Sequence, residues 1–150
     1  MQDIYSHIES HVDQSIKQLF ELVRQPSISA QKLGFDKAPN LMKELLDRNG
    51  FISEIVPVPN EGLPTVYGYM PSSENPEAAP TLLFYCHYDV QPVDPLDLWD
   101  TDPFEPTQIG DRLYGRGMSD DKGNIGARLA AVRAFIDQRG GVPCNIKMFC

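Results

Sequence analysis

Two short polar motifs hold the residues of this 150-residue chain that are best suited to metal-dependent chemistry. The first is His87-Tyr88-Asp89, which directly follows an apolar run over 81–86. In an extended segment, residues 87 and 89 point to the same side. The Asp89 carboxylate can then accept a hydrogen bond from the imidazole nitrogen that does not bind a metal, which makes His87 a more basic ligand. The same pair also suits a catalytic histidine or a buried His–Asp contact, so three alternatives remain open.

The second motif is Asp120-Asp121-Lys122-Gly123, which follows the turn at 115–117 and opens an expected helix. Asp120 is expected near the N-cap and Asp121 in the first turn. Aspartate is common at both positions as a cap and as a partner of the helix dipole, so structural capping is the alternative to metal binding. A nucleotide loop is excluded, because the last position of G-x-G-x-x-G counted from 115 is Asp120 and no Walker pattern occurs.

The two motifs become more specific together. Asp120 lies 120 − 87 = 33 positions after His87, and both can meet at the rim of one sheet. A carboxylate can bridge two metal ions about 3.5–4 Å apart. Such a pair suits amide hydrolysis, because one ion lowers the pKa of a bound water, the other polarises the carbonyl, and a nearby glutamate moves the proton. We therefore predict that His87 and Asp120 converge on one divalent-cation pocket.

Other candidate residues are better explained without chemistry. His7 and His11 share a helix face at a metal-competent spacing, but Ile8 stands where an H-E-x-x-H motif needs its general base. We expect these two histidines to be a solvated helix flank. The acidic residues of the 88–111 loop lack the order of a calcium-binding loop and are predicted to be a solvated surface. Cys86 is expected to be a small core residue of its strand.

The elements that must position the two motifs can be predicted from apolar spacing, glycine and proline. Helices are predicted at 3–24, 39–49 and 121–138, and strands at 51–58, 65–70, 81–86, 112–114 and 145–150. The run 81–86 is nearly all apolar, which predicts a strand buried on both faces. The order strand, loop, helix, strand in the second half predicts an α/β fold with a mixed, mostly parallel sheet flanked by helices.

Composition bounds the function classes. The chain has 41% hydrophobic and 23% charged residues, which excludes a disordered chain. Its net charge of −8 argues against nucleic acid and anionic membranes as partners. No apolar run is long enough to span a bilayer, and the N-terminus lacks a secretory signal pattern. Three cysteines without such a signal predict reduced thiols and a cytoplasmic protein.

Several segments resemble the co-catalytic zinc exopeptidase family of carnosinase, aminoacylase, acetylornithine deacetylase and succinyl-diaminopimelate desuccinylase. They are YCHYDVQP at 85–92, Trp99 with DPF at 102–104, LYGRGMSDDKG at 113–123, and LVRQPSIS at 22–29. The H-Y-D-V-Q-P form is most similar to the dipeptidase branch. The resemblance implies that His87 binds one metal ion, that Asp120 bridges two, and that Asp89 clamps His87 and counts as catalytic.

The resemblance further implies two zinc ions in a complete site, with cobalt or manganese also compatible with such ligands. Arg116 is expected to steady its turn, whereas Asp121, Lys122 and Gly123 match the motif without an assigned chemical role. The family also needs a Glu-Glu pair after the strand that ends near Cys150, a further acidic ligand and a distal histidine. It usually carries an inserted lid domain that dimerises.

Those further residues do not occur within 1–150. We therefore expect this chain to be the N-terminal part of a metallopeptidase catalytic domain, incomplete and inactive alone. The function predicted for the complete site is zinc-dependent cleavage of a peptide or N-acyl amide bond in a small substrate, by a protein that is a homodimer when whole. The alternative is a truncated, non-catalytic domain that acts only as a weak metal-binding or interaction module.

Overall fold

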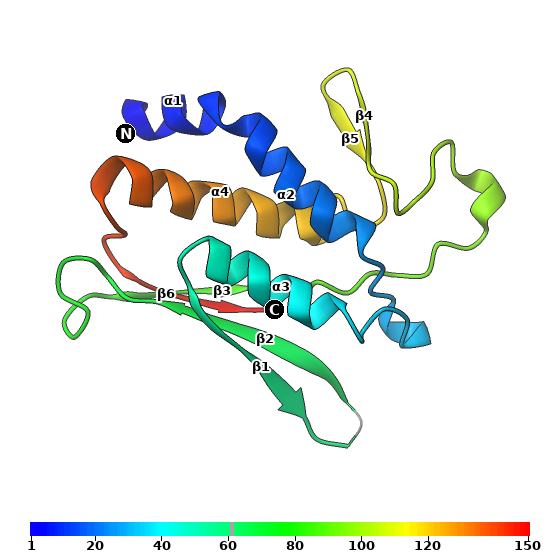
Figure 1. Ribbon diagram of the computed structural model, residues 1–150, viewed down its shortest axis with the longest axis horizontal. Helices are drawn as coiled ribbons and strands as arrows, with labels where there is room; N and C mark the ends of the chain where they lie inside the picture. Colours follow the sequence, from blue (N-terminus) through cyan, green and yellow to red (C-terminus); the bar gives the residue numbers. More distant parts are fainter. Residues whose placement is uncertain (61) are drawn as a thin grey trace.

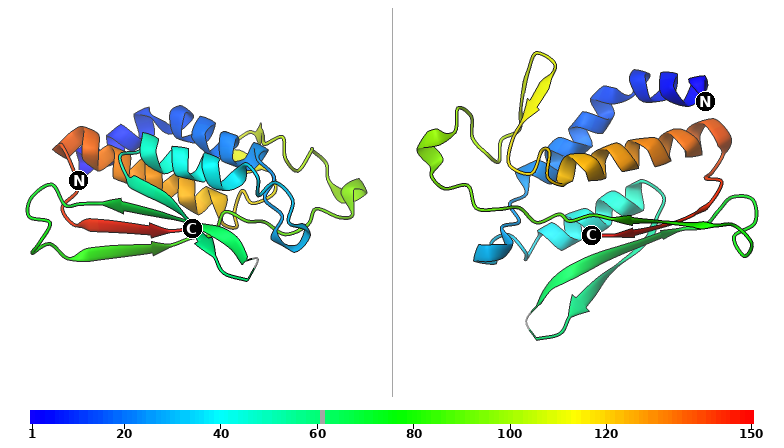
Figure 2. Two further views of the ribbon diagram at one scale, coloured as in Figure 1. Left: turned by 60° about the horizontal axis from the view of Figure 1, so that its bottom comes forward. Right: turned by 180° about the vertical axis from the view of Figure 1, so that it is seen from behind.

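The computed structural model describes residues 1–60 and 62–150. Its elements are α1 (Gln2–Ser10), α2 (Val12–Arg24), the 3-10 turn η1 (Ser29–Gln31), α3 (Ala38–Arg48), β1 (Ile52–Val58), β2 (Gly62–Met70), β3 (Thr81–Tyr85), η2 (Leu96–Leu98), β4 (Thr107–Ile109), β5 (Arg112–Tyr114), α4 (Lys122–Arg139) and β6 (Asn145–Phe149). The four α-helices lie over one face of the main sheet, and the loop after β3 leads to the small β4–β5 hairpin beside it (Figure 1, Figure 2). No helix in the described ranges is long and apolar enough to cross a membrane.

The main sheet has the strand order β1-β2-β6-β3. β3 and β6 are parallel and are joined through α4, which confirms the predicted β–α–β unit. β2 pairs antiparallel with both β1 and β6. The mixed α/β fold class is confirmed, but the expectation of a mostly parallel sheet is corrected, because the β1–β2 hairpin adds two antiparallel pairings to the single parallel one.

The core fills the space between the helices and the covered face of this sheet. Its helical members recur three or four positions apart, so each helix buries one stripe. The cluster includes Leu22, Met42, Leu45, Leu46, Ile125, Leu129 and Val132 from helices, and Val66, Ile146 and Met148 from strands. This packing fixes α4 against β3 and β6, and with it the loop that precedes α4.

The prediction that the strand at 81–86 is buried on both faces is wrong. β3 is the edge strand of the sheet, and its residues Leu83 and Tyr85 are 61% and 75% exposed. Phe149 of the neighbouring strand β6 is also exposed on the open face. An apolar run predicts a surface that favours burial, but it does not say whether other residues of the same chain cover it.

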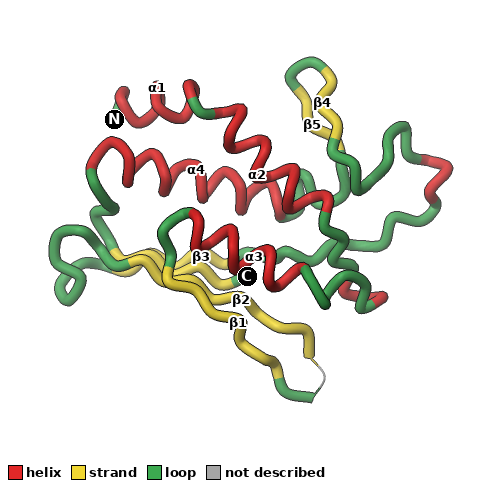
Figure 3. The backbone as a smooth tube through the Cα atoms, viewed as in Figure 1, coloured by secondary structure: helices red, strands yellow, loops and turns green. Residues whose placement is uncertain are grey.

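The first predicted helix is two helices. α1 and α2 meet at His11, whose backbone leaves helical geometry (φ −117°), and the joint is visible as a short non-helical segment in Figure 3. The apolar periodicity continues through this joint, which is why the sequence predicts one helix. The predicted stops after α3 and α4 are confirmed, since Gly50 and Gly140 both have positive φ. β2 begins at Gly62, earlier than the predicted Thr65.

Candidate metal centre

The parallel strand β3 and the helix α4 bring the two polar motifs to the same edge of the sheet. His87 lies two residues after the end of β3, and Asp120 directly precedes Asp121, the N-cap residue of α4. Nε2 of His87 lies 2.9 Å from Oδ1 of Asp120. The convergence predicted from the sequence is therefore present. Asp120 is 84% exposed, so the pair opens to solvent and can accept a further group.

Asp89 occupies the other side of the imidazole. Nδ1 of His87 lies 3.1 Å from the backbone carbonyl oxygen of Asp89 and 3.2 Å from its Oδ1. A carbonyl oxygen only accepts, so Nδ1 carries the proton and donates it to Asp89. Nε2 is then the nitrogen that can hold a metal ion. The carboxylate contact was expected, whereas the backbone contact is a second restraint that the sequence does not show.

The acidic surroundings also shift the protonation of His87. Partial burial acts to lower the pKa of the imidazole, but the Asp89 carbonyl and the Asp120 carboxylate accept hydrogen bonds from the charged form. These acceptors outweigh burial, so the pKa of His87 is raised. A histidine placed between acceptors in this way has the electrostatic environment of a cation site.

Asp121 links the two motifs instead of capping α4. It stands at the N-cap position, one residue earlier than predicted, and its side chain makes no capping hydrogen bond. Its Oδ2 accepts a hydrogen bond from the backbone N–H of His87 at 3.2 Å and lies 3.6 Å from Nη1 of Arg128. The capping interpretation therefore does not account for Asp121, which holds the start of α4 against the end of β3.

Lys122 anchors the same region from inside the protein. Its side chain is buried, and Nζ donates hydrogen bonds to the carbonyls of Leu22 at 2.9 Å and Gln25 at 2.8 Å. Burial lowers the pKa of Lys122 to about 7. The ammonium group thereby ties the C-terminal end of α2 to the beginning of α4. The sequence gives no signal for this contact, because a lysine in a first helical turn is normally a solvent-exposed charge.

The turn before α4 depends on two glycines and one arginine. Gly117 has a φ of +82°, and a Cβ there would lie 2.7 Å from Cγ1 of Val90. At Gly123, a Cβ would lie 2.0 Å from the carbonyl oxygen of Met118, so only glycine allows the turn to approach the helix. Arg116 donates to the Pro92 carbonyl at 3.0 Å, which ties the turn to the long loop as the expected steadying role requires.

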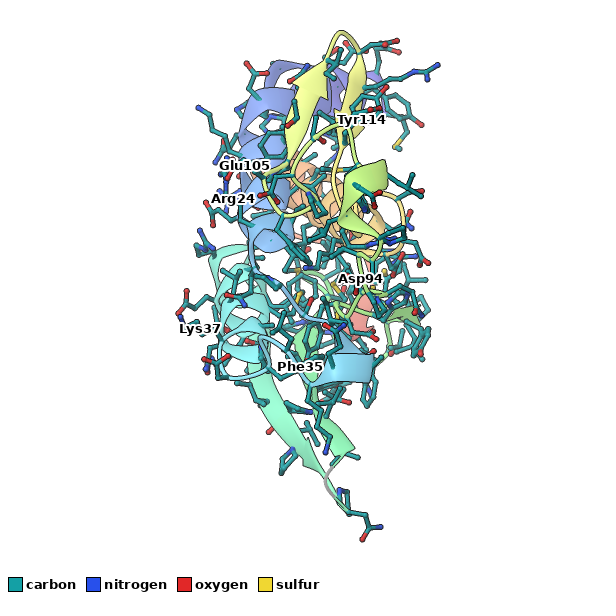
Figure 4. All side chains as sticks on the ribbon, turned by 90° about the vertical axis from the view of Figure 1, so that its right-hand side faces the viewer. Arg24, Phe35, Lys37, Asp94, Glu105 and Tyr114 are labelled. Atoms are coloured by element: carbon teal, nitrogen blue, oxygen red, sulfur yellow. The ribbon has the colours of Figure 1, made fainter. Side chains whose placement is uncertain are left out.

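The long loop that follows β3 is held from both sides. The guanidinium of Arg116 lies 5.0 Å from the ring centre of Trp99, and Trp99 donates to the Val93 carbonyl at 2.9 Å. Nη2 of Arg24, at the end of α2, lies 2.6 Å from Oε1 of Glu105, and Figure 4 labels both residues. A pocket of about 190 Å³ remains, lined by residues that include His87, Asp89, Gln91, Arg116, Ser119 and Asp120.

The donor set in this pocket fits part of a zinc site. One imidazole nitrogen and one carboxylate are ligands that zinc accepts, and the Nδ1 contact of His87 supplies the usual outer support. Across residues 1–60 and 62–150, no group of three or more His, Cys, Asp or Glu side chains is arranged to hold a metal ion. Zinc takes four ligands, or three with water, so a complete zinc site would need further ligands in addition to His87 and Asp120.

The remaining candidates behave as structural residues. The rings of His7 and His11 stack with centres 4.0 Å apart, and Nε2 of His7 lies 3.2 Å from Oδ2 of Asp137 on α4. This contact joins α1 to α4, so the pair is more than a solvated flank, although His11 is exposed. Cys86 is 2% exposed within the core cluster, as expected.

Comparison with known proteins shows that this chain is similar to peptidases and to related hydrolases. Residues 83–150 match the model of peptidase family M20/M25/M40. A Beta-Ala-His dipeptidase of Rattus norvegicus is 31% identical over 98% of this chain and 32% of its own length. A succinyl-diaminopimelate desuccinylase of Herminiimonas arsenicoxydans is 32% identical over 81% of this chain and 31% of its own. The chain spans about a third of the length of the curated relatives it matches.

Solved structures agree with these sequence matches. Human carnosine dipeptidase 1 superimposes with a TM-score of 0.85 at 30% identity, over 99% of this chain and 33% of that one. The M20 family metallo-carboxypeptidase Sso-CP2 from Sulfolobus solfataricus gives a TM-score of 0.80 at 35% identity, over 90% of this chain and 30% of that one. The resemblance expected from the motifs at 85–92 and 113–123 is confirmed.

Proposed function

We propose that the whole protein is a zinc-dependent hydrolase, because residues 83–150 match the model of peptidase family M20/M25/M40. It cleaves a peptide or N-acyl amide bond of a small substrate. The observation that carries this proposal is the 2.9 Å approach of His87 Nε2 to Asp120 Oδ1, with Asp89 on the other imidazole nitrogen. This arrangement leaves a nitrogen and a carboxylate facing one solvent-open pocket.

Each of the three candidate site residues has its own role in the proposed reaction. His87 would hold one zinc ion through Nε2, and Asp120 would bridge that ion to a second. Asp89 is a positioning residue, because it acts on the metal through His87 by holding its proton on Nδ1. Two bound zinc ions would supply a water of lowered pKa and would polarise the scissile carbonyl. Cobalt and manganese suit the same ligands and are the alternatives to zinc.

We further propose that residues 1–150 are the N-terminal part of the catalytic domain and are inactive alone. The chain spans about a third of the length of its relatives, and His87 and Asp120 provide fewer donors than zinc needs. Leu83, Tyr85 and Phe149 form an exposed apolar strip on the sheet, which a larger domain would cover. The general base and remaining ligands would then lie outside these residues.

The substrate class follows from the relatives. The matched proteins are named as dipeptidases and desuccinylases, so a dipeptide or an N-acyl amino acid is the proposed substrate. A homodimer of the whole protein rests on the family resemblance alone. We propose a cytoplasmic location, which is supported by three cysteines that suit a reducing compartment as free thiols.

The test is metal analysis and hydrolysis by the whole encoded protein. We expect bound zinc and cleavage of dipeptides or N-succinyl amino acids in the native protein, and strong loss of both in His87→Ala and Asp120→Asn. Asp97→Asn, in an exposed part of the long loop, is the matched control and should leave both unchanged. A folded whole protein that binds no metal and hydrolyses neither substrate class would instead support the alternative of a non-catalytic interaction module.

A further inference from the structure

Two cysteines lie side by side where β3 and β6 end. These strands are parallel and in register, with Tyr85 opposite Phe149. The backbone N–H of Cys86 donates to the Phe149 carbonyl at 2.8 Å, which continues the ladder by one residue. Cys86 and Cys150 are therefore neighbours across the sheet. Both belong to the core cluster on the helix-covered face, with exposures of 2% and 8%.

The spacing of this pair suits a disulfide. Neighbouring strands lie about 4.7–4.9 Å apart, and disulfides span Cα separations of about 4.4–6.8 Å. Both side chains belong to the core cluster on the helix-covered side, so the two thiols lie on the same face of the sheet. A covalent link between them needs no change in strand pairing.

The pair borders a cavity. Cys86 and Cys150 both line a cavity of about 270 Å³, together with residues that include Phe35, Tyr85, His87 and Phe149. Nη1 of Arg128 lies 2.9 Å from Sγ of Cys86. A guanidinium at this distance stabilises the negative charge that develops on a sulfur when it attacks an electrophile. The cavity offers space for a small oxidant, and Arg128 supplies the electrostatic support.

We propose that Cys86 and Cys150 form a reversible dithiol site that hydrogen peroxide oxidises to a disulfide. The Cys86 sulfur attacks one peroxide oxygen, the O–O bond breaks, and one water leaves as a sulfenic acid forms. The Cys150 sulfur then attacks the Cys86 sulfur, the S–O bond breaks, and a second water leaves. The two thiols together lose two electrons and two protons, and hydrogen peroxide is reduced to two waters. A dithiol reductant reverses the oxidation by thiol–disulfide exchange.

Cys144, at the other end of β6, provides a matched control. It immediately precedes β6 (Asn145–Phe149), whereas Cys150 immediately follows that strand, so the two lie at opposite ends. It is half-buried and free. A general sensitivity of the cysteines to oxidant would involve Cys144 as readily as Cys150. A site built by the register of β3 and β6 involves only Cys86 and Cys150.

The experiment is peptide mapping of the whole encoded protein, with its metal bound, after titration with hydrogen peroxide and alkylation of free thiols. We expect a peptide containing Cys86 joined to one containing Cys150, lighter by two hydrogens than the reduced pair and separated again by dithiothreitol. Cys144→Ser should keep this cross-link, and Cys86→Ser and Cys150→Ser should abolish it.

The mapping of the native protein decides the proposal even where a serine variant fails to fold. The proposal is overturned if Cys86 and Cys150 remain alkylable at a peroxide dose that has oxidised the exposed Met1. It is equally overturned if the disulfide that forms joins Cys144 or two separate molecules. The readout is covalent structure and not hydrolysis, so this outcome is separate from that of the proposed function.

Discussion

Nε2 of His87 and Oδ1 of Asp120 lie 2.9 Å apart, although 33 positions of the chain separate the two residues. A second link lies beside the first, because Asp121 accepts a hydrogen bond from the backbone N–H of His87. The distance between the proposed ligands therefore depends on how β3 and α4 pack. Residues that hold this packing should affect metal binding without touching a metal.

The first prediction concerns Asp89. Asp89→Ala removes one of the two acceptors of His87 Nδ1 but keeps the backbone carbonyl at 3.1 Å. We expect metal affinity to fall about 10-fold, at the lower end of the roughly 10–100-fold effects of lost outer partners. Competition with a chromogenic chelator measures this in the whole protein, with Asp97→Ala as control. Unchanged affinity would show that the carbonyl alone orients the ring.

Lys122 supplies a prediction for stability. Lys122→Met leaves the carbonyls of Leu22 and Gln25 buried without their donor, and each such group costs about 1–3 kcal/mol. We expect the free energy of unfolding to fall by about 2 kcal/mol or more, measured by urea denaturation. Lys43→Met is the control, because the exposed Lys43–Asp47 pair should be worth only about 0.5 kcal/mol. Equal losses in the two variants would contradict the anchoring role.

Gly117 tests the close approach of the turn to the long loop. Gly117 and Gly110 both have positive φ, so alanine strains the backbone at either position. Only at Gly117 would the added Cβ meet another atom, Cγ1 of Val90 at 2.7 Å, whereas space around Gly110 is open. We expect Gly117→Ala to lose about 1–3 kcal/mol more stability than Gly110→Ala in thermal or urea unfolding. A smaller loss at Gly117 would mean that Val90 moves aside freely.

Asp137 gives a pH-dependent prediction for the contact between α1 and α4. Hydrogen bonds from Arg133 hold the pKa of Asp137 below its ordinary value of 3.8, and His7 adds to this effect. Because the folded-state pKa is the lower one, the contribution to stability is present above about pH 4 and is lost as the pH falls through the folded value.

For Asp137→Asn we therefore expect a loss of up to about 1 kcal/mol at pH 7 that shrinks towards pH 2. Urea unfolding at several pH values measures the difference between the native protein and the variant. Asp97→Asn should show no such trend. A deficit for Asp137→Asn that stays constant across this range would mean that the charge of Asp137 does not contribute.

Local patterns in the sequence predict the helical part of this fold well. The apolar spacing of 121–138 and the glycine after it predict α4 closely, because a helix is built from contacts three and four residues apart. The break at His11 is missed, since the apolar stripe continues across it. The exposure of β3 is missed for a different reason: burial of a strand depends on what covers the sheet, which a local run of residues does not encode.

The sequence by itself determined the chemistry available at the site. The residue types and spacing of His87, Asp89 and Asp120, together with the apolar strand and the helix that flank them, are properties of short segments. Tertiary structure alone decided which atoms meet: Asp120 at Nε2, the carbonyl of Asp89 at Nδ1, and Lys122 under the end of α2. It also placed Cys150 beside Cys86. Apart from the Asp89 carbonyl, which lies only two residues from His87, these contacts join residues far apart in the chain, and only the packing of β3, β6, α2 and α4 brings them together.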